Sequence, residues 1–291
     1  MTINKNTNFL IVGLGLMGGS YAMALKRKGY RVESITLSQK SIDYAMNKGI
    51  IDRGSVSVEP EMIKRADIVV FALYPHVFEE WISKYGDLFN AGTIITDVTG
   101  VKSSVVYKIQ SMLKNGVEFI PAHPMAGREV YGVENATDSI FKEANYIVVP
   151  TAANTEQAIM VCEELGKILG FKRISRLSPE EHDKMIAFLS QLTHCIAISL
   201  MCANDDKNIS KYTGDSFRDL TRIARINEEM WSELFLLNKT ELISQIDAFS
   251  AQLCALRNAI ENDDAEVLKE MMKESTERRK LFDAVQEGKT L

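Results

Sequence analysis

The sequence has little cysteine, no strongly basic stretch and no long apolar run, and each shortage excludes a class of protein. Its four cysteines form no CxxC pair, which predicts reduced thiols in the core rather than disulfides or a zinc site. A formal net charge of −5 leaves no cationic surface for a phosphate backbone, so we expect no nucleic-acid partner. No apolar run reaches the roughly 20 residues that span a bilayer, and no signal-peptide pattern opens the chain. We therefore expect a cytoplasmic protein without a membrane partner.

The length and the order of apolar segments predict two domains. A chain of 291 residues is long for one hydrophobic core, because single cores stop growing near about 250–300 residues. The first half alternates short β-rich runs with amphipathic stretches, beginning with Phe9–Val12, Met17–Lys28 and Val32–Leu37. This βαβ order predicts a doubly wound, mostly parallel α/β sheet of eight or so strands, including one at Tyr146–Val149.

After Phe171–Ser175 the pattern changes from strand to helix. Ser178-Pro179-Glu180-Glu181 combines an N-cap serine, a proline in the first turn and a capping-box glutamate, so a helix is expected to begin there. No proline follows Pro179, and apolar residues recur at helical spacing from there on. The second half is thus expected to be all-α. Its long apolar stripes need a cover, which predicts a homodimer through this region.

A glycine motif at the first strand-to-helix turn predicts a dinucleotide site. The first glycine permits a tight turn, the second lets a pyrophosphate approach the backbone, and the third lets helix and strand pack closely. The helix N-terminus adds unpaired N–H groups for the anion. The motif predicts a dinucleotide-binding Rossmann domain at residues 1–176, followed by the helical domain at residues 177–291. The cofactor-binding residues expected in the motif are Gly13, Gly15, Leu16, Met17 and Gly18.

The residues after the second strand bear on the choice between NAD and NADP. In NAD-specific domains an acidic residue about 20 positions past the motif binds the ribose 2′-hydroxyl. Ser38, Gln39 and Lys40 hold that place here. A hydroxyl, an amide and a cation can bind a 2′-phosphate, whereas an acidic side chain at this place would repel it. We therefore expect NAD(P) with a modest preference for NADP. The alternative is that Lys40 is only a solvated residue at a helix start.

Two segments carry polar residues to the carboxyl ends of strands, where open α/β sheets bind ligands. These two segments are Asp97-Val98-Thr99-Gly100-Val101-Lys102 and His123-Pro124-Met125-Ala126-Gly127 with Glu129. Two segments of the helical half are equally distinctive, namely Ser178-Pro179-Glu180-Glu181-His182-Asp183 and Phe217-Arg218-Asp219-Leu220-Thr221-Arg222-Ile223-Ala224 with Met230-Trp231. Together with the glycine motif, these segments resemble prephenate dehydrogenases in order and spacing, from about Phe9 to about Leu256. Related arogenate dehydrogenases share the pattern.

The resemblance implies oxidative decarboxylation of prephenate to 4-hydroxyphenylpyruvate, in tyrosine biosynthesis. A hydride leaves the hydroxyl-bearing ring carbon for the cofactor, and carbon dioxide leaves the opposite ring carbon. His123 is carried over as the catalytic hydrogen-bond acceptor for the ring hydroxyl. Neutral imidazole, with an ordinary pKa near about 6.5, can fill that role at cellular pH.

The resemblance also assigns residues to the substrate and the cofactor. His194 matches a position that lines the substrate pocket, although a histidine on an apolar helix is more often a core residue. Arg222 matches an arginine that binds a substrate carboxylate through two charge-assisted hydrogen bonds. Glu129 and Lys102 match polar positions near the substrate, and Thr99 is expected near the cofactor. We expect the other polar and aromatic residues of these segments to be surface, capping or core residues: Arg218, Arg225, His182, Asp183 and Trp231.

Two positions depart from the family pattern. Gly100 stands where many members have a serine whose hydroxyl helps to hold substrate and nicotinamide, so the nicotinamide orientation and the choice of substrate are less constrained. Arg128 stands where smaller polar residues are common. An extra cation there could meet the pyruvyl carboxylate of prephenate, whereas it would repel the amino group of arogenate, which favours prephenate. The chain also shows no βαββαβ segment for a regulatory amino-acid-binding domain, so we expect the short form of the family.

Other protein classes fit the sequence less well. Arogenate dehydrogenase is the alternative activity, and a dinucleotide-sensing regulator without catalysis is the alternative from another class. β-Hydroxyacid dehydrogenases and pyrroline-5-carboxylate reductases also join a Rossmann domain to a helical one. Neither leads us to expect a His-Pro-Met-Ala-Gly segment, and no metal site is expected.

Overall fold

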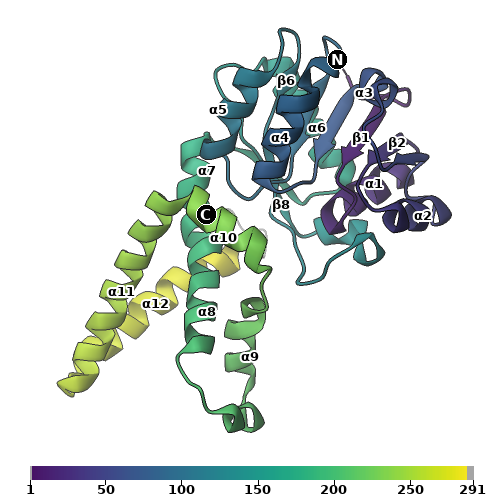
Figure 1. The fold of residues 1–291 in the computed structure, drawn as a ribbon. Coiled ribbons are helices and arrows are strands. Elements are labelled where there is room, and N and C mark those ends of the chain that lie inside the picture. The colour runs from purple at the N-terminus through teal and green to yellow at the C-terminus, as the bar shows by residue number, and fades with distance from the viewer. Residues whose placement is uncertain (1, 287–291) are drawn as a thin grey trace. The chain divides into compact units, whose positions relative to one another are not determined.

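The computed structural model describes residues 2–286 (Figure 1). The chain divides into a larger compact unit, residues 1–239, and a smaller one, residues 240–291. The expected boundary at residues 176–177 marks the change from α/β structure to helix rather than a break in packing. The last five residues of the expected helical domain, 287–291, lie outside the described residues.

The central sheet has six parallel strands in the order β3-β2-β1-β4-β5-β6. This is the strand order of the Rossmann fold, so the expected fold class is confirmed. The strands that bury both faces are rich in branched apolar residues, as parallel sheets require. Their bounds are β1 Asn8–Val12, β2 Arg31–Ile35, β3 Arg53–Ser55, β4 Ile68–Phe71, β5 Ile94–Asp97 and β6 Glu118–Phe119.

Three later strands form a second small sheet, so the expectation of one extended sheet is wrong. In it β7 (Ala122–Pro124) pairs antiparallel with β8 (Asn145–Val148), which pairs parallel with β9 (Arg173–Arg176). Pro121 lies between β6 and β7 and has no N–H to donate, which ends the ladder to β5. Its carbonyl instead accepts from the Val149 N–H at 2.8 Å. The chain thus leaves the first sheet just before His123.

Helices cover both faces of the central sheet and form two cores. One core joins the sheet to α1, α2, α6 and the second sheet, and contains Tyr21 and Tyr146. The other joins it to α3, α4 and α5, and contains Phe71 and Phe78, whose rings stack 4.3 Å apart. Burying each such side chain contributes about 2–3 kcal/mol. The helices are α1 Leu16–Arg27, α2 Gln39–Asn47, α3 Pro60–Arg65, α4 Pro75–Tyr85, α5 Ser103–Met112 and α6 Glu156–Leu169.

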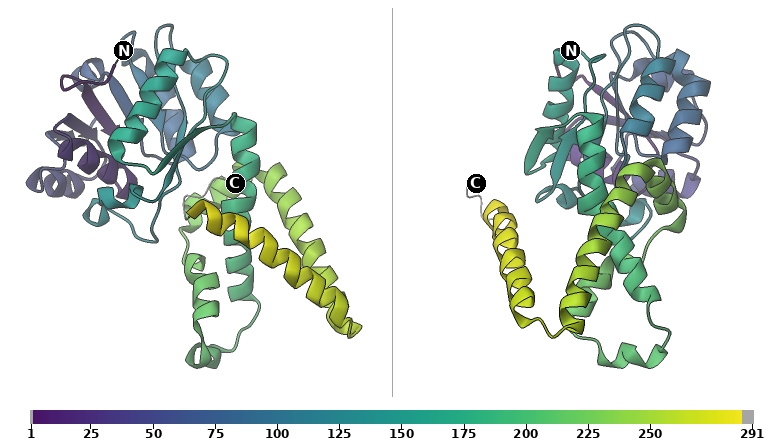
Figure 2. Two further views of the ribbon diagram at one scale, coloured as in Figure 1. Left: turned by 180° about the vertical axis from the view of Figure 1, so that it is seen from behind. Right: turned by 90° about the vertical axis from the view of Figure 1, so that its left-hand side faces the viewer.

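The remainder of the larger unit is helical, as expected. The Ser178–Glu181 capping box is present, and it starts a continuous helix of three segments (Figure 2). Its middle segment is a π-helix, a rare form that often occurs at functional sites. The segments are α7 Pro179–Ile186, the π turn Ala187–Leu192 and α8 Thr193–Cys202, followed by α9 Asp215–Thr221 and α10 Glu228–Leu237. Short 3₁₀ turns lie at Gly86–Leu88, Val133–Asn135, Asp138–Phe141, Lys207–Tyr212 and Arg222–Ala224.

The continuous helix Pro179–Cys202 is long and apolar enough to cross a membrane, judged by length and composition alone. Three polar side chains of this helix, His182, Asp183 and Gln191, are buried and hydrogen-bonded within the larger unit. Apolar residues on the same helix are exposed, among them Phe188 and Met201. Within residues 2–286, this side of the helix stays exposed to solvent.

The smaller unit consists of most of α11 (Lys239–Glu261) and of α12 (Ala265–Gln286). Asp264 caps the second helix by accepting from the Val267 N–H. In α11 only Leu242 and Ala259 are buried. The two helices expose a larger apolar set, namely Ile243, Phe249, Leu253, Ile260, Val267, Met272, Leu281 and Phe282.

The turn between β1 and α1 depends on two of its three motif glycines. Gly13 has φ +95°, and a Cβ there would lie 2.4 Å from the Ala72 carbonyl oxygen. A Cβ on Gly18 would lie 1.9 Å from the Gly13 carbonyl oxygen. A Cβ on Gly15 would meet no atom within 4 Å, and its φ of −93° suits any residue. Position 15 is therefore open space beside the backbone.

We expect Gly18→Ala to destabilise the protein and Gly15→Ala to leave stability unchanged. The added methyl group at position 18 must displace backbone, at a cost of about 3 kcal/mol. Thermal unfolding should show Tm falling by on the order of 10 °C for Gly18→Ala, while Gly15→Ala stays within about 2 °C of the parent. Equal Tm values for the two variants would contradict this account of the turn.

Candidate functional site

A cavity of about 640 Å³ lies at the carboxyl ends of β1, β4 and β5. The sheet supplies one wall and helices α7 to α10 supply the other, all within the larger unit. The size suits a small organic ligand, and the position is where open α/β sheets bind ligands. Five stretches line it: Gly15–Gly18, Ala72–Pro75, Val98–Gly100, His123–Gly132, and residues of the helical wall from Ile186 to Leu234.

The glycine turn gives this cavity an anion-binding end. Gly15 to Gly18 line it, and Gly13 lets the chain turn there through its positive φ. The first turn of α1 carries no acidic side chain, and its N–H groups lack partners within the helix. Free N–H groups at a helix N-terminus bind pyrophosphate well. The open space at Gly15 fits a dinucleotide, because a phosphate can reach the backbone there.

Ser38 and Lys40 lie outside the cavity lining, exposed at the carboxyl end of β2. The Ser38 hydroxyl accepts from the Ser41 N–H at 3.1 Å and so caps α2. Its own hydrogen remains available to a ligand. The stretch from Thr36 to Lys40 carries no carboxylate. An anionic group at this edge would meet a hydroxyl and a cation.

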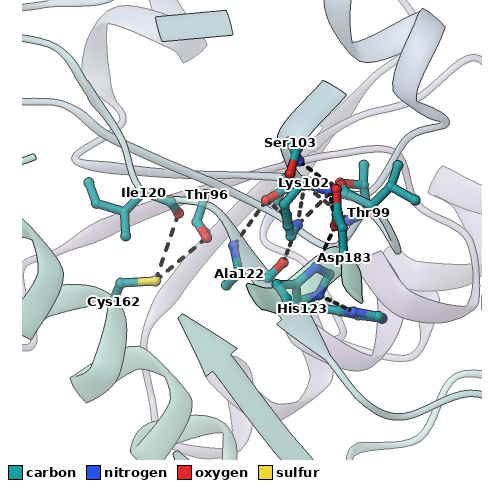
Figure 3. A network of polar contacts seen from close by, with 12 residues as sticks. Thr96, Thr99, Lys102, Ser103, Ile120, Ala122, His123, Cys162 and Asp183 are labelled. Carbon is teal, nitrogen blue, oxygen red and sulfur yellow. Dashed lines mark hydrogen bonds and ion pairs between the residues drawn. The ribbon is translucent and has the colours of Figure 1, made fainter. Parts of the chain in front are cut away.

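His123 lies in β7 at the end of a chain of three hydrogen-bonded side chains. Its Nδ1 lies 2.9 Å from His182 Nε2, and His182 Nδ1 lies 2.7 Å from Asp183 Oδ1 (Figure 3). A carboxylate only accepts, so His182 Nδ1 carries a proton and its Nε2 accepts from His123. The remaining nitrogen of His123, Nε2, therefore has a free lone pair, and the ring lines the cavity. The chain of contacts makes His123 a hydrogen-bond acceptor toward a ligand.

The electrostatics keep both imidazoles neutral. Burial, helped by His182 and Lys102, holds the pKa of His123 well below its ordinary 6.5. Burial also lowers the pKa of His182, although Asp183 opposes this. Burial works against the Asp183 carboxylate, but bonds from His182 and from two backbone N–H groups outweigh it and lower the Asp183 pKa. The network thus holds its negative charge on Asp183 and leaves the histidines uncharged.

A buried ion pair lies beneath His123. Lys102 Nζ donates to both Asp97 oxygens, at 2.9 and 2.7 Å, and both side chains are at most 1% exposed. It also donates to the Ala122 carbonyl at 2.7 Å, and Asp97 accepts from the Ala122 N–H at 3.0 Å (Figure 3). Asp183 accepts from the N–H groups of Lys102 and Ser103, each at 2.8 Å. These contacts fix β5, β7, α5 and α7 around His123.

Lys102 does not reach the cavity, which corrects the expectation that it binds substrate. Its hydrogens are used by Asp97, the Ala122 carbonyl and the Thr99 hydroxyl, and it is fully buried. Burial lowers its pKa while Asp97 opposes this. Thr99 lines the cavity, but its hydroxyl already bonds to Asp97 and to the Val101 carbonyl. Lys102 is a positioning residue.

Arg222 forms an ion pair with Glu129, which lines the cavity, while Arg222 itself does not. The arginine one turn later, Arg225, does line it, as does Arg128. Arg225 is exposed, as expected of a surface residue, and it also contributes to the cavity lining.

His194 and Trp231 form one face of the cavity. Their rings stack 3.6 Å apart, and His194 Nδ1 bonds to the Ser190 carbonyl at 2.9 Å, one turn back through the π-helix. His194 therefore offers Nε2 to a ligand, and burial lowers its pKa. Trp231, expected as a core residue, also lines the cavity. Gln191 holds this wall by donating to the Leu234 carbonyl at 2.9 Å.

Gly100 lines the cavity directly beside His123. A Cβ there would lie 4.0 Å from His123 Cε1 and 3.3 Å from the flexible end of the Leu234 side chain. The position is therefore close enough to His123 for a side chain to act on the same ligand. With glycine, position 100 adds no side chain to this corner of the cavity beside His123 and Leu234.

The sequence missed four residues of the site: His182, Asp183, Arg225 and Trp231. The first two were expected to finish a capping turn, but their side chains bond to His123 and to the start of α5. An adjacent His-Asp pair just inside a well-capped helix was the available signal. For the other two, helical spacing from Arg222 and from the apolar residues of α10 gives no hint of which side faces the cavity.

Comparison with known proteins gives the same family in sequence and in structure. Residues 21–174 match the family model described as prephenate dehydrogenase, nucleotide-binding domain, and residues 178–274 match its dimerization domain. A prephenate dehydrogenase of Bacillus subtilis is 31% identical over 270 residues, which cover 89% of this chain and 71% of the relative. A cyclohexadienyl dehydrogenase of Zymomonas mobilis is 32% identical over 288 residues, 96% of each chain.

Solved structures agree with this result. The crystal structure of prephenate dehydrogenase from Aquifex aeolicus, in complex with hydroxyphenyl propionate and NAD⁺, superposes with a TM-score of 0.87 at 30% identity, over 95% of this chain and 98% of that one. Synechocystis arogenate dehydrogenase, at 22% identity and a TM-score of 0.81, shares the fold. From its sequence motifs, its strand order and the two matched family models, the chain belongs to the prephenate dehydrogenase family.

Proposed function

We propose that this protein catalyses the oxidative decarboxylation of prephenate to 4-hydroxyphenylpyruvate with NAD(P), a step of tyrosine biosynthesis in the cytoplasm. One observation carries the proposal. His123 stands in the cavity beside the dinucleotide turn, with its acceptor nitrogen left free by the bonds to His182 and Asp183. Kinship with prephenate dehydrogenases supplies the substrate class.

His123 accepts the hydrogen bond of the ring hydroxyl while hydride leaves the same ring carbon. The bound nicotinamide supplies the acceptor for that hydride. The electron pair of the broken carbon–carboxylate bond enters the ring as carbon dioxide departs, and the ring becomes aromatic. The proton that His123 holds in the transition state returns to the oxygen that becomes the phenol. His182 and Asp183 favour this step, because they stabilise positive charge that develops on His123.

The remaining polar residues of the cavity bind and orient the substrate. We assign His194 and Arg128 to direct contact, and Glu129 to a contact shared with Arg222 through their ion pair. The Trp231 ring stacked on His194 gives the ring of the substrate an apolar surface. Asp97 and Lys102 do not contact the substrate but fix the backbone at Ala122, next to His123.

The cofactor and assembly form part of the same proposal. Gly13, Gly15, Leu16, Met17, Gly18 and Thr99 are assigned to the dinucleotide, and Ser38 with Lys40 to a 2′-phosphate, which favours NADP. Residues 1–176 are proposed as the nucleotide domain and residues 177–291 as the helical domain. The exposed apolar residues of α8 and α11 support a homodimer through the helical part, which the matched dimerization model also supports.

Arogenate is the second candidate substrate, because it shares the ring and differs from prephenate only in the side chain. The four combinations of prephenate or arogenate with NAD or NADP decide between them, followed by absorbance of the reduced cofactor. Turnover of any combination disposes of a purely sensing role. Turnover of arogenate alone would replace the proposed substrate.

The first expected outcome concerns His123. His123→Asn removes the acceptor nitrogen and should lower kcat by about 10²–10⁴-fold. Binding of the dinucleotide, measured by fluorescence titration, should be unchanged. The matched control is His76→Asn, because His76 is an exposed histidine outside the cavity lining. A His123→Asn variant that keeps parental kcat would overturn the assignment.

The second expected outcome is the pH dependence of kcat/KM. His123 acts in its neutral form, so activity is present above its pKa and is lost as pH falls through it. Because that pKa lies well below 6.5, kcat/KM should stay level from about pH 8 to 6.5 and fall only at lower pH. An acidic limb centred above pH 6.5, the ordinary histidine value, would show that burial does not act as described.

The third expected outcome concerns the 2′-phosphate. Lys40→Ala should raise KM for NADP by roughly three- to tenfold, because an exposed ion pair is lost, and leave KM for NAD unchanged. Lys48→Ala, an exposed lysine at the other end of α2, is the control. Equal effects of Lys40→Ala on both cofactors would remove the case for NADP.

A further inference from the structure

The charged residues of the cavity wall are unevenly paired. Three of them line it, Arg128, Glu129 and Arg225. Glu129, the one carboxylate of the lining, is neutralised by Arg222 from outside it. Within residues 2–286, neither Arg128 nor Arg225 has an acidic side chain within 4.0 Å, and neither donates a side-chain hydrogen bond. Two positive charges are therefore left uncompensated in the wall.

The Glu129–Arg222 ion pair also brings these two arginines to the same part of the cavity. Arg128 is the chain neighbour of Glu129, and Arg225 follows Arg222 by three residues, about one helical turn. One ion pair thus joins the segment after β7 to the segment before α10. Each segment carries an unpaired arginine close to its member of the pair, Arg128 in the first and Arg225 in the second. The Glu129–Arg222 ion pair also acts on His194, because Glu129 raises the pKa of His194 and Arg222 lowers it.

We propose that Arg225, together with Arg128, makes the cavity select a substrate with a 2-oxo acid side chain over the matching 2-amino acid. The inference rests on the proposed function and names the residues that choose between its two candidate substrates. A 2-oxo acid side chain carries one full negative charge, which two guanidinium groups attract. In the 2-amino acid an ammonium group lies beside the carboxylate, cancels much of that attraction and is repelled by both arginines.

The test compares kcat/KM for prephenate and for arogenate in the full-length protein. Arg225→Gln and Arg128→Gln keep a polar side chain, although a shorter one, and remove the charge. Because both arginines are exposed and unpaired, the variants should fold as the parent does, which Tm verifies. The control is Arg218→Gln, a nearby exposed arginine paired with Asp215 and absent from the cavity lining. Arg225→Lys tests whether charge alone is sufficient.

We expect each glutamine variant to lower kcat/KM for prephenate by about 10- to 100-fold, mainly through KM, and to change the value for arogenate by less than about threefold. Arg225→Lys should recover part of the loss, and Arg218→Gln should behave as the parent. The preference of the parent for prephenate should also weaken as salt is added.

Three outcomes would overturn the inference. Equal losses with both substrates would show that the arginines act on the shared ring carboxylate or on the fold. Glutamine variants with parental kinetics would show that they do not touch the side chain, while leaving the proposed function intact. A parent protein that turns over neither substrate would remove the proposed function and this inference together.

Discussion

The buried Asp97–Lys102 ion pair is the contact on which the geometry of the site depends. Two full charges in a dry interior are costly to desolvate, and removing one partner of such a pair costs about 3–5 kcal/mol. Here the pair is saturated by backbone and hydroxyl groups, and those partners lie at the ends of β5 and β7. The position of His123 in the cavity follows from the bonds that this pair makes to Ala122, its chain neighbour.

The fold and the core of the site could be read from the sequence wherever the signal is local. The glycine turn, the Ser178–Glu181 capping box and the His-Pro segment after a strand each occupy a few consecutive residues. Their short-range geometry is set by φ, by caps and by strand ends. Local signals therefore predicted the Rossmann domain, the first helix of the second half and the place of His123 at the carboxyl end of the sheet, while the family resemblance supplied its catalytic role.

Contacts between distant residues could not be read in the same way. His123 and His182 are 59 positions apart, and only the folded chain brings Nδ1 of one to Nε2 of the other. Lys102 illustrates the converse error, because a lysine beside an active-site strand suggests a ligand contact until its burial is known. Pro121 had a local effect that was visible in the sequence, yet its consequence, a second sheet, depended on where β8 could pair.

The hydrogen bonds that link His123, His182 and Asp183 have a consequence for when the protein becomes active during its synthesis. His123 belongs to the first half of the sequence, but the groups that set its tautomer arrive on the first helix of the second half. The glycine turn that binds a dinucleotide lies wholly in the part of the chain before α7. Without α7, His123 has no preferred proton acceptor, so chemistry begins only after the later helix has docked. Docking of α7 and the fixing of the His123 tautomer are therefore one event.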